Sequence, residues 1–427
     1  MMKIMPVDQF DAEDFKTPPI QAGNKIEAAV DDIIRCVREK GDQALIDYAA
    51  RFDRAIIDNV VVSDKEIEEA FNSCDPEFLE TLRLARDNIE AFHSHQKRNS
   101  FTVCDENGKV LGQRIIPLRR VGLYVPGGTA SYPSSVLMNA IPPKIAGVKD
   151  IVITTPPGKD GKIAPAILCA AKIAGVTRII KAGGAQAVAA LAYGTESVPA
   201  VDKIVGPGNV YVATAKRRVY GVVDIDMIAG PSEILVIADG KSNPESVAAD
   251  LLSQAEHDKL ASAILVTDSE VLAKAVQIEV ERQLALLPRQ EIARASIDSN
   301  GKIIVAHDLM QGVEIANLIA PEHLEICVDE PFAMLGLIES AGSVFLGRNA
   351  PEALGDYWAG PNHTLPTSGT ARFSSPLSVD DFVKKSQFLY YSREALAEAK
   401  DHIVSFANRE GLNAHANSVA VRFGERV

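Results

Sequence analysis

The fold is decided by DIVITTPP (residues 150–157) and the runs that follow it, which are IAPAILCAAKIAG (163–175), TRIIKAGG (177–184), AQAVAALAYG (185–194), KIVGPG (203–208) and NVYVATAKRRVY (209–220). Short β-branched runs alternate here with alanine-rich helical runs. Apolar strands separated by helices are typical of βαβ units around a parallel sheet. We therefore predict one α/β lobe from this stretch.

The same alternation resumes further along the chain. It comprises EILVIADG (233–240), a helix from about Pro244 to His257, ASAILVTD (261–268), a long helix to about Leu287, KIIVAHD (302–308) and a helix toward Leu318. A second α/β lobe is implied, so the expected fold class is α/β, with two Rossmann-like lobes built on parallel sheets.

The flanking segments have a different texture. Residues 25–95 show apolar positions at helical spacing, residues 355–370 are rich in Gly, Pro, Asn and Thr and are predicted to be loop, and the last fifty or so residues look helical and polar. We expect residues 1–22 to form an N-terminal extension and residues 371–427 a helical C-terminal segment. We expect residues 23–121 and 233–370 to form the first lobe, and residues 122–232 the second.

Composition excludes several classes of protein. The 427 residues are 47% hydrophobic and 24% charged, which is the balance of a soluble globular protein. The formal net charge of −13 argues against nucleic acid as a partner. Five scattered cysteines indicate neither a disulfide framework nor a thiolate zinc cluster. With no membrane-length apolar run and no leader-like start, the chain is expected to be cytoplasmic.

Two pairs of polar residues in the first lobe are candidates for a chemical role. Gln254 and His257 are three residues apart and share one helix face. This arrangement is compatible with one half of a metal site and equally with an ordinary polar helix end. Glu322 and His323 lie where a helix passes into a strand, a place that suits proton transfer or a solvated loop.

Two further patches lie nearer the C-terminus. The segment GDYWAGPNH contains Asp356, which suits either a metal ligand or a turn cap, and His363, whose role stays open. The segment REGLNAHANS contains Glu410 and His415, which equally suit an exposed terminal helix.

Three glycine-containing turns are candidates for a cofactor: YVPGG (124–128), KAGGAQ (181–186) and GPGN (206–209). The last two stand where a strand passes into a helix, so backbone N–H groups there are able to receive phosphate oxygens. None matches the strict G-x-G-x-x-G pattern, and each also suits a purely structural turn.

Taken together, these patches resemble the histidinol dehydrogenase family, in order from about Arg119 to the C-terminus. The matching stretches are YVPGG, KAGGAQAVAALAYGTE, VDKIVGPGNVYV, DMIAGPSEILVIAD, LLSQAEHD, APEHLE, DYWAGPNHTLPTSGTARFSSPL and EGLNAHANSV.

The resemblance implies a role for each candidate residue. It implies one zinc ion per subunit, held by Gln254, His257, Asp356 and His415, an oxygen and nitrogen set without thiolate. It implies that Glu322 and His323 are catalytic and that Tyr124, Gln186 and Asn209 contact NAD. The implied substrate contacts are Ser232, His323 and Glu410, together with the four zinc ligands.

The implied activity is a zinc- and NAD-dependent oxidation of L-histidinol through L-histidinaldehyde to L-histidine, the closing reaction of histidine biosynthesis. His323 takes the alcohol proton, Glu322 helps to activate water for the second oxidation, and zinc holds the substrate. The resemblance also implies an intertwined homodimer in which Glu410 and His415 complete the partner's site. Two alternatives remain at this point: a related dehydrogenase of another polar alcohol, such as a sulfonated diol, and a non-catalytic metal or amino-acid binding protein.

Overall fold

The computed structural model describes residues 1–15, 23–127 and 131–426. The chain divides into two compact units, of which the first comprises residues 1–96 and 118–382 and the second residues 97–117 and 383–427. The first unit contains two parallel sheets and the second one antiparallel sheet, so the predicted α/β class with parallel-sheet cores is confirmed.

The first lobe is built on a six-stranded parallel sheet of order β1-β11-β10-β9-β12-β13. Its strands are β1 (Lys3–Pro6), β9 (Glu233–Ala238), β10 (Ser262–Thr267), β11 (Lys302–Val305), β12 (His323–Cys327) and β13 (Ser343–Leu346). Its helices are α9 (Pro244–Ala255), α10 (Glu270–Leu284), α11 (Gln290–Asn300), α12 (Leu309–Ile319), α13 (Pro331–Leu335) and α14 (Glu352–Tyr357).

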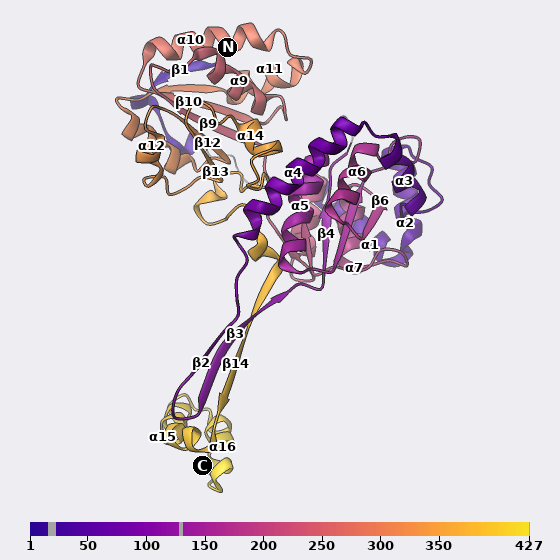
Figure 1. Ribbon diagram of the computed structural model, residues 1–427, viewed down its shortest axis with the longest axis vertical. Helices are drawn as coiled ribbons and strands as arrows, with labels where there is room; N and C mark the ends of the chain where they lie inside the picture. The colour runs from indigo at the N-terminus through magenta and orange to yellow at the C-terminus, as the bar shows by residue number, and fades with distance from the viewer. Residues whose placement is uncertain (16–22, 128–130, 427) are drawn as a thin grey trace. The chain divides into compact units, whose positions relative to one another are not determined.

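Alternate residues of the central strand enter two different cores. Ile234 and Val236 of β9 pack with α9, α10 and α11, whereas Leu235 and Ile237 pack with α12. Figure 1 shows α10 and α11 on one side of this sheet and α12 on the other. Both faces are therefore covered, which is why the strands are continuous apolar runs.

The second lobe has a five-stranded parallel sheet of order β6-β5-β4-β7-β8. Its strands are β4 (Arg120–Tyr124), β5 (Asp150–Thr155), β6 (Arg178–Lys181), β7 (Lys203–Val205) and β8 (Asp224–Ile225). The helices between them are α5 (Pro133–Ala146), α6 (Pro165–Ala174), α7 (Gly184–Tyr193) and α8 (Val210–Val219).

The N-terminal helices pack on the second lobe, not on the first as expected. They are α1 (Asn24–Lys40), α2 (Asp42–Tyr48), α3 (Asp64–Ser73) and α4 (Pro76–Ser94). Val30 and Val37 of α1 share one core with Val188 of α7, while Leu82 of α4 shares another with Met138 of α5. The predicted grouping of residues 23–121 with 233–370 is therefore wrong, because these apolar faces are buried against the other sheet.

The predicted N-terminal extension is also partly incorporated into a lobe. Residues 3–6 form β1, which pairs in parallel with β11 at the edge of the first sheet. Two short helical turns follow, η1 (Val7–Gln9) and η2 (Ala12–Phe15). Residues 16–22 of that predicted extension lie outside the described residues.

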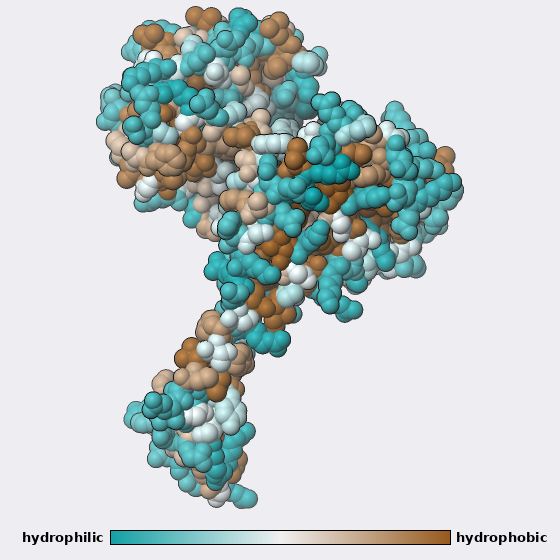
Figure 2. All heavy atoms as spheres, viewed as in Figure 1, coloured by the Kyte–Doolittle hydropathy of each residue, from teal (hydrophilic) through white to brown (hydrophobic). Residues whose placement is uncertain are grey.

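The second unit contains strands that the sequence analysis missed. Strands β2 (Phe101–Cys104), β3 (Lys109–Pro117) and β14 (Val383–Tyr391) form an antiparallel sheet of order β14-β3-β2, followed by α15 (Arg393–Arg409) and α16 (Asn413–Ala420). The C-terminal segment is therefore α-helical only after Tyr391, with two short 3-10 turns, η4 (Thr370–Arg372) and η5 (Val379–Phe382), before β14. Phe101, Val103 and Leu389 are more than half exposed, and Figure 2 shows apolar side chains along this sheet.

None of the helices in the described part of the chain combines the length and the apolar character that a membrane crossing requires.

Candidate active site

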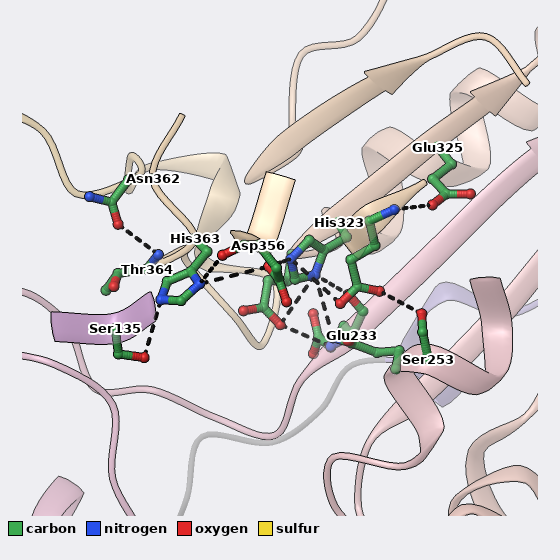
Figure 3. A network of polar contacts seen from close by, with 12 residues as sticks. Ser135, Glu233, Ser253, His323, Glu325, Asp356, Asn362, His363 and Thr364 are labelled. Carbon is green, nitrogen blue, oxygen red and sulfur yellow. Dashed lines mark hydrogen bonds and ion pairs between the residues drawn. The ribbon is translucent and has the colours of Figure 1, made fainter. Parts of the chain in front are cut away.

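A cluster of acidic and imidazole side chains gathers at the amino ends of β9 and β12 (Figure 3). Glu233 begins β9, and His323 begins the neighbouring strand β12, where it pairs with Ile234. Glu322 directly precedes His323, as the sequence predicted. The adjacent strands are parallel, so these side chains meet at one edge of the sheet.

One hydrogen bond defines the state of His323. Its Nδ1 lies 3.1 Å from the carbonyl oxygen of Glu233, so Nδ1 carries the proton and donates it. The other ring nitrogen, Nε2, is buried and has no hydrogen-bond partner among the described residues. Burial lowers the pKa of His323 to about 4, although Asp356 opposes the shift. The ring is therefore neutral at pH 7, and Nε2 offers a free lone pair.

Glu322 lies on the other side of the imidazole. Its Oε2 accepts a hydrogen bond from the backbone N–H of Glu233 at 2.9 Å and lies 3.7 Å from His323 Nδ1. Burial raises the pKa of this carboxyl well above its ordinary range, and the negative charges of Glu233 and Asp356 add to the effect. A carboxylate with a raised pKa is a stronger base, which suits activation of water.

His257, Glu352 and Asp356 form a group with the geometry of a metal site. One potential ligand atom from each lies within 4.8 Å of the others. His257 follows α9, whereas Glu352 and Asp356 lie four residues apart on α14 and therefore on one helix face. Asp356 Oδ1 and Glu352 Oε1 also lie 3.8 and 3.9 Å from His323 Nε2. These three residues, called the metal group below, therefore face the free lone pair of His323.

The amide of Gln254 adds to the fit for a cation. With its nitrogen toward Glu352, the amide donates to Oε2 at 3.2 Å and its oxygen accepts from Glu233 N–H at 2.9 Å. In the reverse orientation the amide oxygen faces the carboxylate oxygens of Glu352. The first orientation satisfies both amide atoms and is therefore the one that Gln254 adopts. Gln254 is fully buried beside this group, and its amide together with the imidazole and the carboxylates makes an oxygen and nitrogen donor set that suits a hard or borderline divalent ion.

His363 connects the site to the second lobe. Its Nδ1 lies 3.1 Å from the carbonyl oxygen of Asp356, and its Nε2 lies 3.2 Å from Ser135 Oγ on α5. Burial lowers the pKa of His363, with Asp356 acting in the opposite direction. Its contact with the Asp356 carbonyl oxygen supports the end of α14 that carries Asp356.

The sequence analysis did not identify Glu352 as a site residue, nor Glu325, which holds its backbone. Glu352 is 2% exposed, and its backbone N–H donates to Glu325 Oε1 at 2.8 Å. Burial raises the pKa of both carboxyls well above the ordinary range. The stretch around Asp356 was predicted to be loop, whereas the structure has the short helix α14 there. The spacing of four residues between Glu352 and Asp356 was the one available signal for the pair, because it places both carboxylates on one face of a helix.

The remaining predicted substrate contacts lie in separate places. Ser232 directly precedes β9 and is partly exposed. Glu410 follows α15 and His415 lies on α16, so both belong to the second unit, where both side chains are exposed.

The predicted cofactor residues belong to the second lobe. Tyr124 ends β4, and its hydroxyl accepts a hydrogen bond from Gly184 N–H at 3.1 Å. Gln186 is buried in the first turn of α7, whereas Asn209 is exposed and caps α8 by accepting from the N–H groups of Tyr211 and Val212. The turn YVPGG reaches residue 128, which lies outside the described residues.

The strand order of the second lobe marks a candidate ligand site. From β4, the chain adds β5 and β6 on one side and then β7 and β8 on the other. Ligands of open α/β sheets bind at the carboxyl ends of strands where the order reverses, here β4 and β7. Gly206, directly after β7, has φ +113°, and a Cβ there would overlap the carbonyl oxygen of Tyr124. The GPGN turn therefore packs against the end of β4.

Comparison with known proteins agrees with the motifs. The family model described as histidinol dehydrogenase matches residues 17–423. A histidinol dehydrogenase of Bacillus thuringiensis is 58% identical over 400 residues, covering 94% of this chain and 93% of the relative, and one of Clostridium acetobutylicum is 56% identical, covering 92% and 91%. The crystal structure of histidinol dehydrogenase from Elizabethkingia anophelis has a TM-score of 0.93 at 40% identity and covers 99% of this chain and 98% of that one. These matches confirm the resemblance drawn from the sequence.

Proposed function

Because the chain belongs to the histidinol dehydrogenase family, a family of oxidoreductases, we propose that it oxidises L-histidinol through L-histidinaldehyde to L-histidine with zinc and two molecules of NAD. The observation that carries this proposal is the free, buried Nε2 of His323, which faces the metal group. A neutral imidazole in this position is a general base ready for an alcohol proton.

The protein's own residues move the protons. His323 Nε2 takes the hydroxyl proton of the substrate, while the Nδ1–H bond to Glu233 holds the ring in the required tautomer. After the first oxidation, the Glu322 carboxylate removes a proton from water as the water adds to the aldehyde carbon. His323, which holds the proton taken from the alcohol, returns it to the aldehyde oxygen as the water adds, and it then takes the proton of the hydrated aldehyde in the second oxidation. Burial of both side chains keeps bulk water away from a reactive aldehyde.

The residues that would hold zinc are Gln254, His257 and Asp356, with the partner subunit's His415. The ion supplies Lewis-acid charge that anchors and orients the substrate, and NAD supplies the hydride acceptor. Glu352 was not among the predicted ligands, but its carboxylate belongs to the same group of ligand atoms. Its place beside Gln254 suits orientation of that amide.

The cofactor would bind in the second lobe, at the carboxyl ends of β4 and β7. In this proposal it contacts Tyr124, the N-terminus of α7 and the turn that leads into α8, the helix that Asn209 caps. Gln186 lies in the first turn of α7, near the N–H groups that suit a diphosphate.

The assembly in this proposal is a cytoplasmic homodimer. The exposed apolar side chains of the second unit provide a surface for a second copy of the chain. The partner subunit's Glu410 and the partner subunit's His415 would complete each site.

Steady-state assays test the proposal. The zinc-loaded protein is expected to reduce NAD with L-histidinol, and a protein that ignores histidinol but oxidises a sulfonated diol would overturn the substrate assignment. His323→Asn is expected to lower kcat by about 10²–10⁴-fold, the range for loss of a general base, while the zinc content stays unchanged. A variant with full turnover would remove the basis of the mechanism. His307→Asn, an exposed histidine of the same lobe, is the control.

A further inference from the structure

Asp53 is a carboxylate without a partner at the edge of the second lobe. It ends the single wide helical turn η3 (Ala49–Asp53) that follows α2, and Arg54 after it adopts a left-handed conformation with φ 57°. Its Oδ2 is buried, and no side chain or backbone group of the described residues donates to it. The neighbouring Arg51 does not serve as a partner, because its guanidinium lies over the ring of Phe52, 5.2 Å from the centroid.

Asp53 lies in the same lobe as the candidate cofactor site, which is formed by the carboxyl ends of β4 and β7. Ala49 and Ala55, which flank this turn, are buried in the same core as Tyr124, Ala182 and Ala185. The chain then pairs with the edge of β6, where Lys181 N–H donates to the carbonyl oxygen of Val60 at 2.7 Å. The negative charge of Asp53 also acts on Tyr124, whose phenol pKa is raised by burial and further by this carboxylate.

Tyr124 itself contacts both glycine turns. The phenol hydroxyl accepts from Gly184 N–H, and the ring lies 3.0 Å from where a Cβ on Gly208 would stand. Asp53 therefore belongs to the lobe that carries both glycine turns, within range for its charge to act on Tyr124. An unpaired, desolvated carboxylate costs stability, so a ligand that brings donors to it gains from the interaction.

We propose that Asp53 binds the ribose hydroxyls of the dinucleotide and thereby sets the preference for NAD over NADP. This inference rests on the proposed function and adds a residue to its cofactor site. A vicinal diol presents two O–H donors to one carboxylate, which is how acidic residues read the ribose in other dinucleotide-binding folds. The same carboxylate repels a 2′-phosphate, because no basic side chain among the described residues neutralises it.

Equilibrium titration with NAD and NADP, alongside steady-state assays with histidinol, tests the inference on the zinc-loaded protein. Asp53→Asn is expected to raise the Kd and KM for NAD about tenfold, as for loss of a hydrogen bond to a charged group. The variant should also reduce the ratio of the Kd for NADP to the Kd for NAD about tenfold, while kcat and zinc content stay unchanged. Asp58→Asn, an exposed residue on the same segment, is the matched control and should alter neither ratio.

The outcomes separate this inference from the function on which it rests. If the unaltered protein reduces NAD with histidinol but Asp53→Asn keeps the same Kd for NAD and the same NADP discrimination, the assignment of Asp53 is wrong and the proposed function stands. If the unaltered protein binds neither dinucleotide, the proposed function itself fails. Should Asp53→Asn bind poorly because it is misfolded, the Tm would fall; the inference requires that the Tm does not fall.

Discussion

At the scale of single residues, the surroundings of His323 determine its tautomer and its charge, and therefore its chemical role. The carbonyl oxygen of Glu233 fixes the proton on Nδ1, and burial keeps the ring neutral. The sequence placed Glu322 and His323 together at a helix-to-strand junction, because neighbours in the chain remain neighbours in space. It did not place Glu233 there, since that contact depends on β9 and β12 being adjacent in the sheet.

Glu352 gives the first prediction at this scale. Glu352→Gln removes a carboxylate that contacts the Gln254 amide and belongs to the metal group. Zinc affinity is expected to fall about 10–100-fold, the usual cost of losing a residue that orients a metal ligand. Zinc retained after dialysis against a graded chelator measures this directly. Glu339→Gln, on an exposed carboxyl of the same lobe, should retain zinc like the unaltered protein, and equal retention by both variants would contradict the role of Glu352.

Asp53 gives a prediction about stability and pH. Burial raises its pKa from 3.8 to about 6, so the folded state holds this proton more tightly than the unfolded state. The contribution of Asp53 to the free energy of unfolding is therefore fully present below about pH 4, and it is lost as the pH rises through 6. Asp53→Asn should raise Tm at pH 8 by about 2–4 °C, the shift that ~1 kcal/mol produces in a large domain. Thermal melts at pH 4 should show no gain, and a gain of equal size at both pH values would contradict the assignment.

At the scale of secondary structure, the strands of the two sheets were the most predictable elements. Runs such as ILVIA in β9 are buried on both faces, so their β-branched composition identifies them without tertiary information. Strand β14 has the opposite character, because seven of its nine residues are exposed, and nothing in its apolar pattern marked it as a strand. Helix α14 was missed because Gly355 and the Pro and Asn residues after it favoured a loop.

The turn after β7 gives a prediction at this scale. Gly206→Ala places a methyl group against the carbonyl oxygen of Tyr124 at a backbone φ of +113°. The GPGN turn would have to move, and NAD affinity is expected to fall about tenfold or more while zinc binding in the first lobe is unchanged. Calorimetric titration of NAD measures the effect. Gly221→Ala also has a positive φ but meets no atom within 4 Å, so it isolates backbone strain from the clash. Equal losses in the two variants would contradict a role for the turn.

At the scale of the whole molecule, the two lobes share one order of five strands, to which the first lobe adds β1 at its edge, but they use this order differently. In the first lobe the order reverses between β9 and β12, yet the carboxyl ends of these strands are occupied by ion pairs from Arg348 to Asp239 and Asp329, at 2.6 Å each. The chemistry therefore lies at the amino ends of those strands. The carboxyl ends in the second lobe carry glycine turns instead, so one dinucleotide site per chain is expected.

The lobe on which the N-terminal helices pack could not be predicted from the sequence. An amphipathic helix such as α1 shows that one face is buried, but its pattern does not say against which sheet. The proposed contributions of Glu410 and His415 are equally beyond local pattern, because in the proposed assembly they depend on a second copy of the chain.

Mixed dimers test that shared arrangement. One chain carries His257→Ala, the other His415→Ala, and the heterodimer is isolated with two different affinity tags. If each site takes its histidine from the partner, one of the two sites regains a full set of ligands and about half of the unaltered activity returns. Homodimers of either variant serve as controls. A heterodimer as inactive as these controls would show that the sites are not shared.

The stoichiometry of NADH formation tests the central claim most directly. L-histidinol is supplied as the limiting reagent to the zinc-loaded protein with excess NAD, and the NADH formed is compared with the histidine recovered. We predict two NADH and one L-histidine for each histidinol consumed. A yield of one NADH with free aldehyde, or no NADH at all, would contradict the account.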